Sequence, residues 1–158
     1  MAIKRFFLTA LLLLVSCGGP VREKQSPARE EQFVVEFKKL GLSAAVVVSP
    51  FPPAVDEYFS FTLRFWKTAE GTVNEGPFIV PEYLIAHPGI RLYMPEHGHG
   101  SAPFMFAEKS NSFGKYFAVS NGVSTMPGNW EIQLRLKKDK TAPPEDEAVI
   151  KYFASETR

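Results

Sequence analysis

Cysteine is almost absent from this 158-residue chain, in which Cys17 is the single example. One thiol excludes an internal disulfide framework and leaves no CxxCH motif for covalent haem attachment. An excess of charge of one sign is also missing, because 18 basic residues oppose 17 acidic ones. This balance gives no basic patch of the size that nucleic-acid binding requires. Because no disulfide can form within the chain, the stability of the folded part must come from side-chain packing.

Long hydrophobic runs are missing as well. The longest, residues 6–15, is ten residues long, whereas a membrane-spanning helix needs about 20. Because it follows Lys4 and Arg5 and ends in small residues, the run is typical of a secretory signal peptide. The final letters LVSC, residues 14–17, resemble the bacterial lipobox. That resemblance implies that residues 1–16 are removed and that Cys17 carries a diacylglycerol, with its new N-terminus acylated.

Several acyl chains give a firm membrane anchor, at about 0.8 kcal/mol per buried CH₂. We therefore expect a lipid-anchored protein of the cell envelope that faces the periplasm. Gly18 follows the cysteine in place of aspartate, which by resemblance to lipoprotein sorting in Gram-negative bacteria favours the outer membrane. An ordinary signal peptide with a structural cysteine is the alternative, although Cys17 stands next to glycines and no core sequence surrounds it.

Between the expected lipid site and the domain, residues 18–32 read GGPVREKQSPAREEQ. This segment is polar, charged and interrupted by two prolines, so it cannot bury enough apolar surface to fold. We expect residues 17–32 to comprise the lipidated cysteine and a flexible tether that reaches on the order of 20 Å. A capped helix through 27–39 is the alternative for the second half. Residues 33–158 then form a single domain.

Alternation of apolar and polar residues predicts strands in this domain. Segments 59–65 and 130–137 place apolar residues at every second position, as half-buried antiparallel strands do. Further strands are expected at 43–49, 90–94, 103–108, 115–119 and 147–153. The least regular region, 71–89, is expected to hold a short strand at 78–80 and a helical turn near 83–86. About seven short strands separated by turns predict an all-β fold, an immunoglobulin-like antiparallel β-sandwich.

Two of the three histidines, His97 and His99, lie in the segment MPEHGHG, residues 94–100. The proline and glycines predict a loop. Two imidazoles separated by one residue, with the thioether of Met94 nearby, suit copper, zinc or nickel, and a thioether favours Cu(I). A second thioether, Met126, begins the segment MPGNW. These residues are the candidate metal ligands.

Strand counting tests whether the two segments can meet. Two antiparallel reversals separate the histidine segment from Met126, which places both at the same end of the sandwich. The opposite parity would separate them by roughly 17 to 26 Å. The predicted topology therefore allows a shared site.

The histidine segment, and the later M-x-G-x-W pattern at 126–130 followed by an amphipathic strand, resemble the YtkA-like domain family, which is related in style to FixH-type proteins. The resemblance covers roughly residues 42–138. It implies an immunoglobulin-like extracytoplasmic domain, often a lipoprotein, that binds or hands over copper. By resemblance, Met94, His99 and Met126 are copper ligands. The family often has methionine at the position of His97, so the present ligand set is richer in nitrogen and admits Cu(II) as well as Cu(I).

The leading hypothesis is a membrane-anchored lipoprotein that binds copper for buffering or for delivery to, or receipt from, another envelope protein. Zinc, nickel or no functional metal are alternatives, because Met94 can be a core residue. Another alternative is a non-metal interaction module of the envelope, whose exposed aromatic residues, such as Tyr83, Tyr93 and Phe104, contact a partner protein. An enzyme is not expected, since no triad, phosphate loop or paired-carboxylate motif is present.

Overall fold

The computed structural model describes residues 29–82, 89–139 and 141–156. The expected signal peptide, Cys17, most of the tether, His87 and the expected helical turn lie outside these ranges. The strands are β1 (Glu31–Phe37), β2 (Leu42–Ser49), β3 (Tyr58–Lys67), β4 (Gly89–Met94), β5 (His99–Gly100), β6 (Met105–Asn111), β7 (Gly114–Val123), β8 (Gly128–Leu136) and β9 (Asp146–Ala154). Within the described ranges, no helix is both long enough and apolar enough to cross a bilayer.

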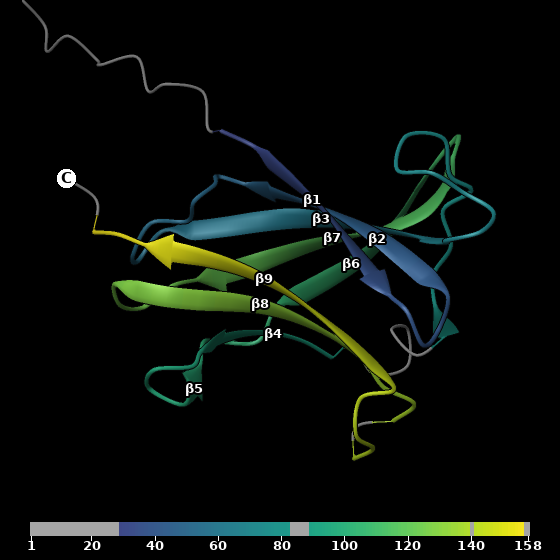
Figure 1. Cartoon of the computed structure of the whole chain (residues 1–158). Coiled ribbons are helices and arrows are strands. Elements are labelled where there is room, and N and C mark those ends of the chain that lie inside the picture. Colours follow the sequence, from purple (N-terminus) through teal and green to yellow (C-terminus); the bar gives the residue numbers. More distant parts are fainter. Residues whose placement is uncertain (1–28, 83–88, 140, 157–158) are drawn as a thin grey trace, which may run out of the picture.

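Two antiparallel sheets pack face to face (Figure 1). One contains five strands in the order β1-β2-β3-β7-β6, and the other contains four in the order β5-β4-β8-β9. Strands β2, β3, β7 and β6 occupy the places of A, B, E and D in the immunoglobulin fold, and β5, β4, β8 and β9 those of C′, C, F and G. The predicted all-β, immunoglobulin-like sandwich is confirmed, with β1 added beside β2.

The seven expected strands are present, with shifted ends. Two further strands were not expected. Strand β1 forms where the sequence predicts the end of the tether or, alternatively, a helix through 27–39. The helix alternative is wrong, because β1 pairs along its whole length with β2, from Glu31 opposite Val48 to Phe37 opposite Leu42. Strand β5 contains only two residues. The expected strand at 78–80 is also wrong, because this segment forms only isolated bridges.

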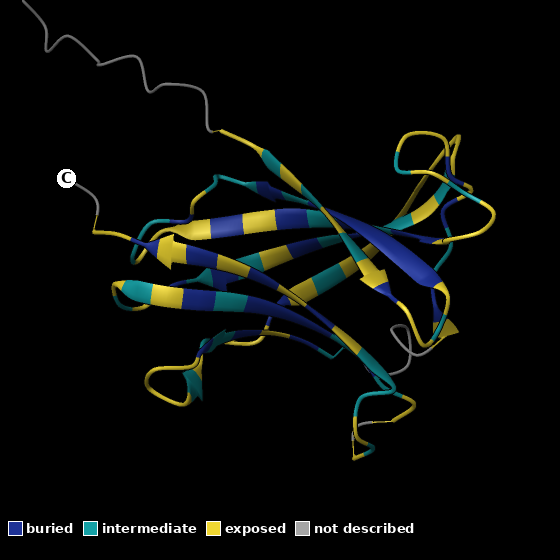
Figure 2. Cartoon of the chain, in the orientation of Figure 1, coloured by how far each residue is buried: buried dark blue, intermediate teal, exposed yellow. Residues whose placement is uncertain are grey.

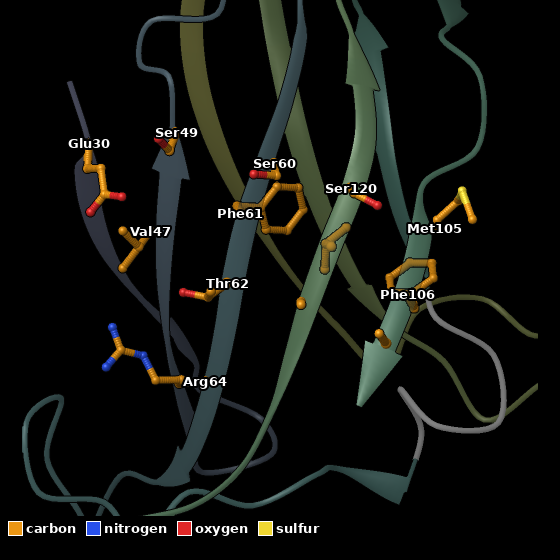
Figure 3. Close-up of a pocket in the computed structure, with 13 residues that line it drawn as sticks. Glu30, Val47, Ser49, Ser60, Phe61, Thr62, Arg64, Met105, Phe106 and Ser120 are labelled. Carbon is orange, nitrogen blue, oxygen red and sulfur yellow. The ribbon is translucent and has the colours of Figure 1, made fainter. Parts of the chain in front are cut away.

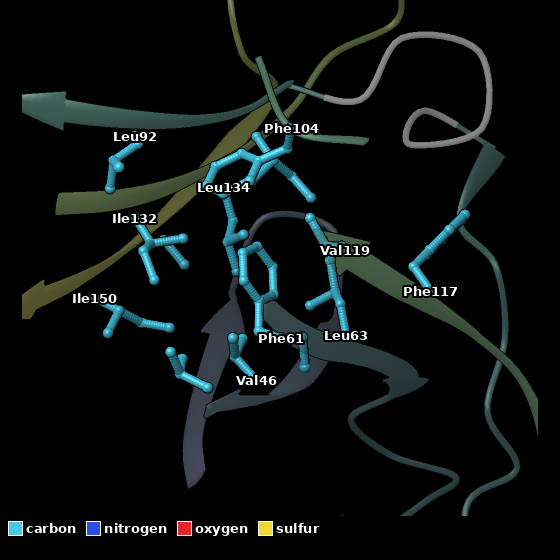
Figure 4. Close-up of a cluster of buried hydrophobic side chains, with 14 of the residues drawn as sticks. Val46, Phe61, Leu63, Leu92, Phe104, Phe117, Val119, Ile132, Leu134 and Ile150 are labelled. Atoms are coloured by element: carbon cyan, nitrogen blue, oxygen red, sulfur yellow. The ribbon is translucent and has the colours of Figure 1, made fainter. Parts of the chain in front are cut away.

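Alternation along each strand builds the core between the sheets. Along β3 and β9, buried and exposed residues follow each other (Figure 2). Side chains of both sheets meet in the space between them (Figure 4). The largest fully buried ones are Trp130, Phe37, Phe65, Leu63, Leu92, Met94, Ile132, Leu134, Leu136, Val46 and Val48. This core holds the strands whose ends carry the candidate site.

One end of the sandwich, here called the histidine end, carries two loops of interest. The histidine loop, residues 95–98, joins β4 to β5, and the methionine loop, residues 124–127, joins β7 to β8. Strand β1 begins and β9 ends at the same end (Figure 1). Backbone bonds join the connection between β2 and β3 to both chain segments, from Phe51 N–H to the Arg29 carbonyl at 2.8 Å and from Val55 N–H to the Ser155 carbonyl at 3.0 Å. The described part of the chain therefore starts at the same end of the sandwich as the two loops.

Candidate metal site at the histidine end

The histidine loop is a tight reversal between two paired strands. Met94 lies directly opposite His99 in the ladder between β4 and β5. The Met94 carbonyl accepts backbone bonds from His97 at 3.3 Å and from Gly98 at 3.0 Å. Gly98 has φ of 65°, a left-handed conformation that glycine adopts at little cost. The sequence HGH thus places one histidine at the tip of the turn and the other on the returning strand.

The start of β8, directly after the methionine loop, lies against the histidine loop. The side-chain amide of Asn129 donates to a carboxylate oxygen of Glu96 at 2.6 Å. Gly128 has φ of 136°, a conformation that favours glycine. A Cβ at this position would meet only the terminal methyl of Met94, the flexible end of that side chain, so glycine is required here by the backbone conformation. The predicted meeting of the two segments at one end of the sandwich is confirmed by these contacts.

Trp130 is the structural support of this end. It is fully buried, and its indole N–H donates to the carbonyl of Met126 at 2.9 Å. The ring of His99 lies edge-on to the indole, with the ring centroids 6.2 Å apart and the planes at 77°. Because opposite residues of an antiparallel pair project to the same face, His99 shares the core-facing side of β5 with Met94. His99 is accordingly half-buried, whereas His97 is exposed.

The two imidazoles are close enough to hold one ion. Their ring centroids are 5.8 Å apart and their planes are inclined by 48°. A metal-to-nitrogen bond of about 2.1 Å places each ring centroid about 3.2 Å from the ion, so two rings on one ion are at most about 6.4 Å apart. The observed separation of 5.8 Å falls within this limit. The spacing of the two rings therefore permits a two-nitrogen site.

The two expected thioethers differ in their surroundings. Met94 is only 1% exposed and belongs to the main core, so its side chain packs between the sheets and lies beside Gly128. Met126 is half-buried and packs against the margin of the same core. Of the two, Met126 is the one with solvent-accessible surface at the histidine end. Of the expected ligands, His97, His99 and Met126 keep accessible surface, whereas Met94 is buried in the core.

A buried hydroxyl pair lies beneath this arrangement. Tyr152 stands opposite Trp130 on β9, and its hydroxyl forms a 2.8 Å hydrogen bond with that of Ser124, at the start of the methionine loop. Burial raises the pKa of the Tyr152 phenol well above its ordinary value, and the bond to Ser124 offsets this only in part. The phenol therefore stays protonated and fixes the methionine loop to β9.

The aromatic residues of the alternative hypothesis are placed less favourably for a partner. Phe104 is 6% exposed and packs edge-on against Phe61, with ring centroids 5.2 Å apart, so its expected exposure is wrong. Tyr93 is half-buried, and the Arg91 guanidinium lies 4.4 Å from its ring centroid. Tyr83 lies outside the described residues. Of these three, only Tyr93 offers described surface to a partner.

Sequence reasoning named the donors of this end but not the residues that position them. Glu96 and Asn129 join the histidine loop to β8, and Trp130 joins β8 to the methionine loop. The signal for Trp130 was its place in the alternation of 130–137. Within the described ranges, no three side chains of His, Cys, Asp or Glu gather as a metal-binding group. The arrangement offers two imidazoles and a thioether, a donor set that suits copper better than hard cations.

Comparison with known proteins adds no neighbour. No protein-family model matches the chain, and neither a characterised protein nor a solved structure matches it.

Proposed function

We propose that this protein is a lipid-anchored, periplasm-facing lipoprotein of the outer membrane that binds a copper ion at its histidine end. It buffers the ion or exchanges it with another envelope protein, and it catalyses no reaction. The observation that carries the proposal is the approach of the His97 and His99 rings to 5.8 Å. The likeness to YtkA-like domains supports the same choice of metal.

The proposed mechanism is ligand exchange. His97 is exposed at the tip of its turn, while His99 is held beside Trp130. Such a site has one exposed and one positioned imidazole, and we propose that the half-buried Met126 of the same end supplies a thioether. An acceptor protein attacks from the His97 side and replaces the ligands one at a time. Imidazole and thioether together accept copper in both oxidation states, with the thioether favouring Cu(I).

Metal titration tests the site. The purified protein is titrated with Cu(I), and separately with Cu(II), against a competing chelator while the tryptophan fluorescence, to which both Trp66 and Trp130 contribute, is followed. We expect binding tighter than micromolar, with quenching of the indole because His99 contacts it. Replacing both His97 and His99 with Ala weakens binding at least tenfold, whereas His87→Ala, the matched histidine control, leaves it unchanged. Micromolar or weaker affinity that is the same in all three proteins contradicts the proposal.

A second pair of variants tests whether the Met126 thioether is a ligand. Met126→Leu keeps the apolar volume and removes the sulfur, and Met105→Leu makes the same change at a methionine that is 66% exposed on β6. We expect Met126→Leu to weaken Cu(I) binding more than Cu(II) binding. Met105→Leu should change neither. Equal Cu(I) affinities for both variants would remove Met126 from the ligand set.

The anchor is tested independently of the metal. Cys17→Ala should abolish palmitate labelling and release the protein from the membrane fraction, because only the acyl chains hold it there. Copper affinity should be unchanged. Membrane fractionation that is the same for Cys17→Ala and for the unaltered protein would show that the attachment lies elsewhere.

A further inference from the structure

The protein's own chain covers only one half of the outer face of the five-stranded sheet. There, the chain that follows β3 folds back and builds a second hydrophobic cluster from Ala45, Trp66 and Phe78. Phe78 packs against Trp66, with ring centroids 6.4 Å apart. Backbone bonds fix this covering segment, among them Ile79 N–H to the Phe65 carbonyl at 2.8 Å. The outer face is therefore one on which the protein already packs an extended stretch of chain.

The other half of this face is open and forms a groove of about 510 Å³, here called the outer groove (Figure 3). This volume lies within the range of about 300 to 1,000 Å³ found for ligand sites. Its lining is made of residues from β2, β3, β6 and β7 with Glu30 before β1. The outward-facing members are Val47, Ser49, Ser60, Thr62, Arg64, Met105, Ala107, Ala118 and Ser120.

Small side chains form the floor of the outer groove. Thr62 on β3 lies opposite Val47 on one side and opposite Ala118 on the other. Ala118 in turn lies opposite Ala107 on β6. A row of four short side chains across four strands allows a second backbone to approach the sheet closely. At the margin, Met105 is 66% exposed and borders the groove (Figure 3).

Arg64 lies where the open half meets the covered half. Its guanidinium carbon is 5.5 Å from the ring centroid of Phe78, the residue that closes this side. The Arg64 Nε is buried and donates to no acceptor. No carboxylate of the described ranges forms an ion pair with it, although the same structure pairs Lys67, Lys115 and Arg135. A guanidinium that lies over an aromatic ring and has no ion-pair partner can bind a planar anion such as a carboxylate.

The length of the outer groove suits a short stretch of extended chain. From Ser60 to Arg64 there are four residue steps, or about 13 Å at 3.3 Å per residue. Serine and threonine hydroxyls at Ser49, Ser60 and Thr62 can bond a peptide backbone, whereas an acyl chain would leave them unpaired. The one carboxylate of the lining, Glu30, is exposed and lies away from Arg64 (Figure 3).

We propose that the outer groove binds an extended peptide segment of a partner protein, with an aspartate or glutamate of that segment paired to Arg64. The bound peptide lies next to the segment of the protein's own chain that packs over Trp66 and Ala45. The groove lies on a sheet face and includes no residue of the histidine loop or the methionine loop, so the binding of the peptide is independent of metal.

Selection from a random heptapeptide library displayed on phage, with the immobilised full chain as bait, tests this proposal. We expect the enriched peptides to contain an acidic residue and to lose at least tenfold in affinity on Arg64→Gln. Replacing their acidic residue with the corresponding amide should cause a similar loss. The matched control is Lys109→Gln, which removes an exposed cation on β6 that does not line the groove and should leave affinity unchanged.

Three outcomes overturn the proposal. The first is no enrichment above bare support. The second is enriched peptides that bind Arg64→Gln and the unaltered protein equally. Lipid binding is examined in the same series with vesicles containing 20% phosphatidylglycerol, and Arg64-dependent vesicle binding without peptide binding would also overturn it.

The position of the peptide is checked by amide chemical-shift mapping. Shifts should gather at Thr62, Ala107 and Ala118 and should not involve His97 or His99. Unaltered dispersion of the remaining amides in Arg64→Gln shows that the variant is folded. Peptide affinity should be the same with and without a copper chelator, so that failure of the metal site and failure of the groove are told apart.

Discussion

The hydroxyl pair beneath the candidate site gives a sharp test of how the methionine loop is held. In Tyr152→Phe the phenolic oxygen is removed and the ring is kept. Ser124 is 0% exposed, so its hydroxyl loses its partner at 2.8 Å without gaining water. An unpaired buried polar group costs about 1 to 3 kcal/mol. We therefore expect the free energy of unfolding to fall by about that amount.

Urea denaturation measures this loss. With a urea dependence of about 1.5 kcal/mol per M, the midpoint should fall by roughly 0.7 to 2 M. The double variant Tyr152→Phe with Ser124→Ala removes both partners, so no polar group is left unpaired and the midpoint should recover in part. Tyr116→Phe, the matched control, alters a half-buried phenol on β7 and should cost less than about 0.5 kcal/mol. A double variant less stable than Tyr152→Phe alone would refute the reasoning.

The remaining predictions concern pH and the backbone conformation of Gly128. Burial raises the pKa of Tyr152 in the folded protein, so the folded state keeps a proton that the unfolded chain loses above about pH 10. Stability should therefore fall as pH rises above 10, by up to about 1.4 kcal/mol per pH unit. Between pH 9 and pH 11, the urea midpoint of the unaltered protein should therefore fall further than that of Tyr152→Phe. Equal falls in the two proteins would contradict this prediction. Gly128→Ala introduces a side chain at an unfavourable φ of 136° and meets only the flexible end of Met94, so it should cost about 1 to 3 kcal/mol through backbone strain. Gly41→Ala, at φ of 63° with open space around it, is the control, and a smaller loss at Gly128 than at Gly41 would contradict this prediction.

The strands that the sequence predicts well are those whose alternation is unbroken. Segments 59–65 and 130–137 alternate because one face of each meets the core, and this signal is local. Strand β1 was missed because it follows a charged segment and lies at a sheet edge, where its outward residue Val34 is 54% exposed. Edge strands bury less surface, so their alternation is less distinct from that of a polar tether.

The candidate site was predictable in its topology and less so in its details. Counting reversals between strands was enough to bring the two loops to one end. The burial of Met94 also had a local signal, since it continues the alternation of Ile90 and Leu92 on β4. The cover that Phe78 forms over the outer face had none, because it depends on contacts with β2 and β3 that no local pattern specifies. Neither the outer groove nor the unpaired state of Arg64 could therefore be foreseen.

The start of the described chain at the histidine end limits how far the domain can travel from a lipid anchor. Twelve residue steps separate Cys17 from Arg29, and at about 3.6 Å per step they span at most about 43 Å. If the acyl chains are on Cys17, the first strand of the domain stays within that distance of the lipid headgroups. A receiving protein must then reach into this layer, and two membrane-anchored proteins search for each other over a surface rather than through a volume.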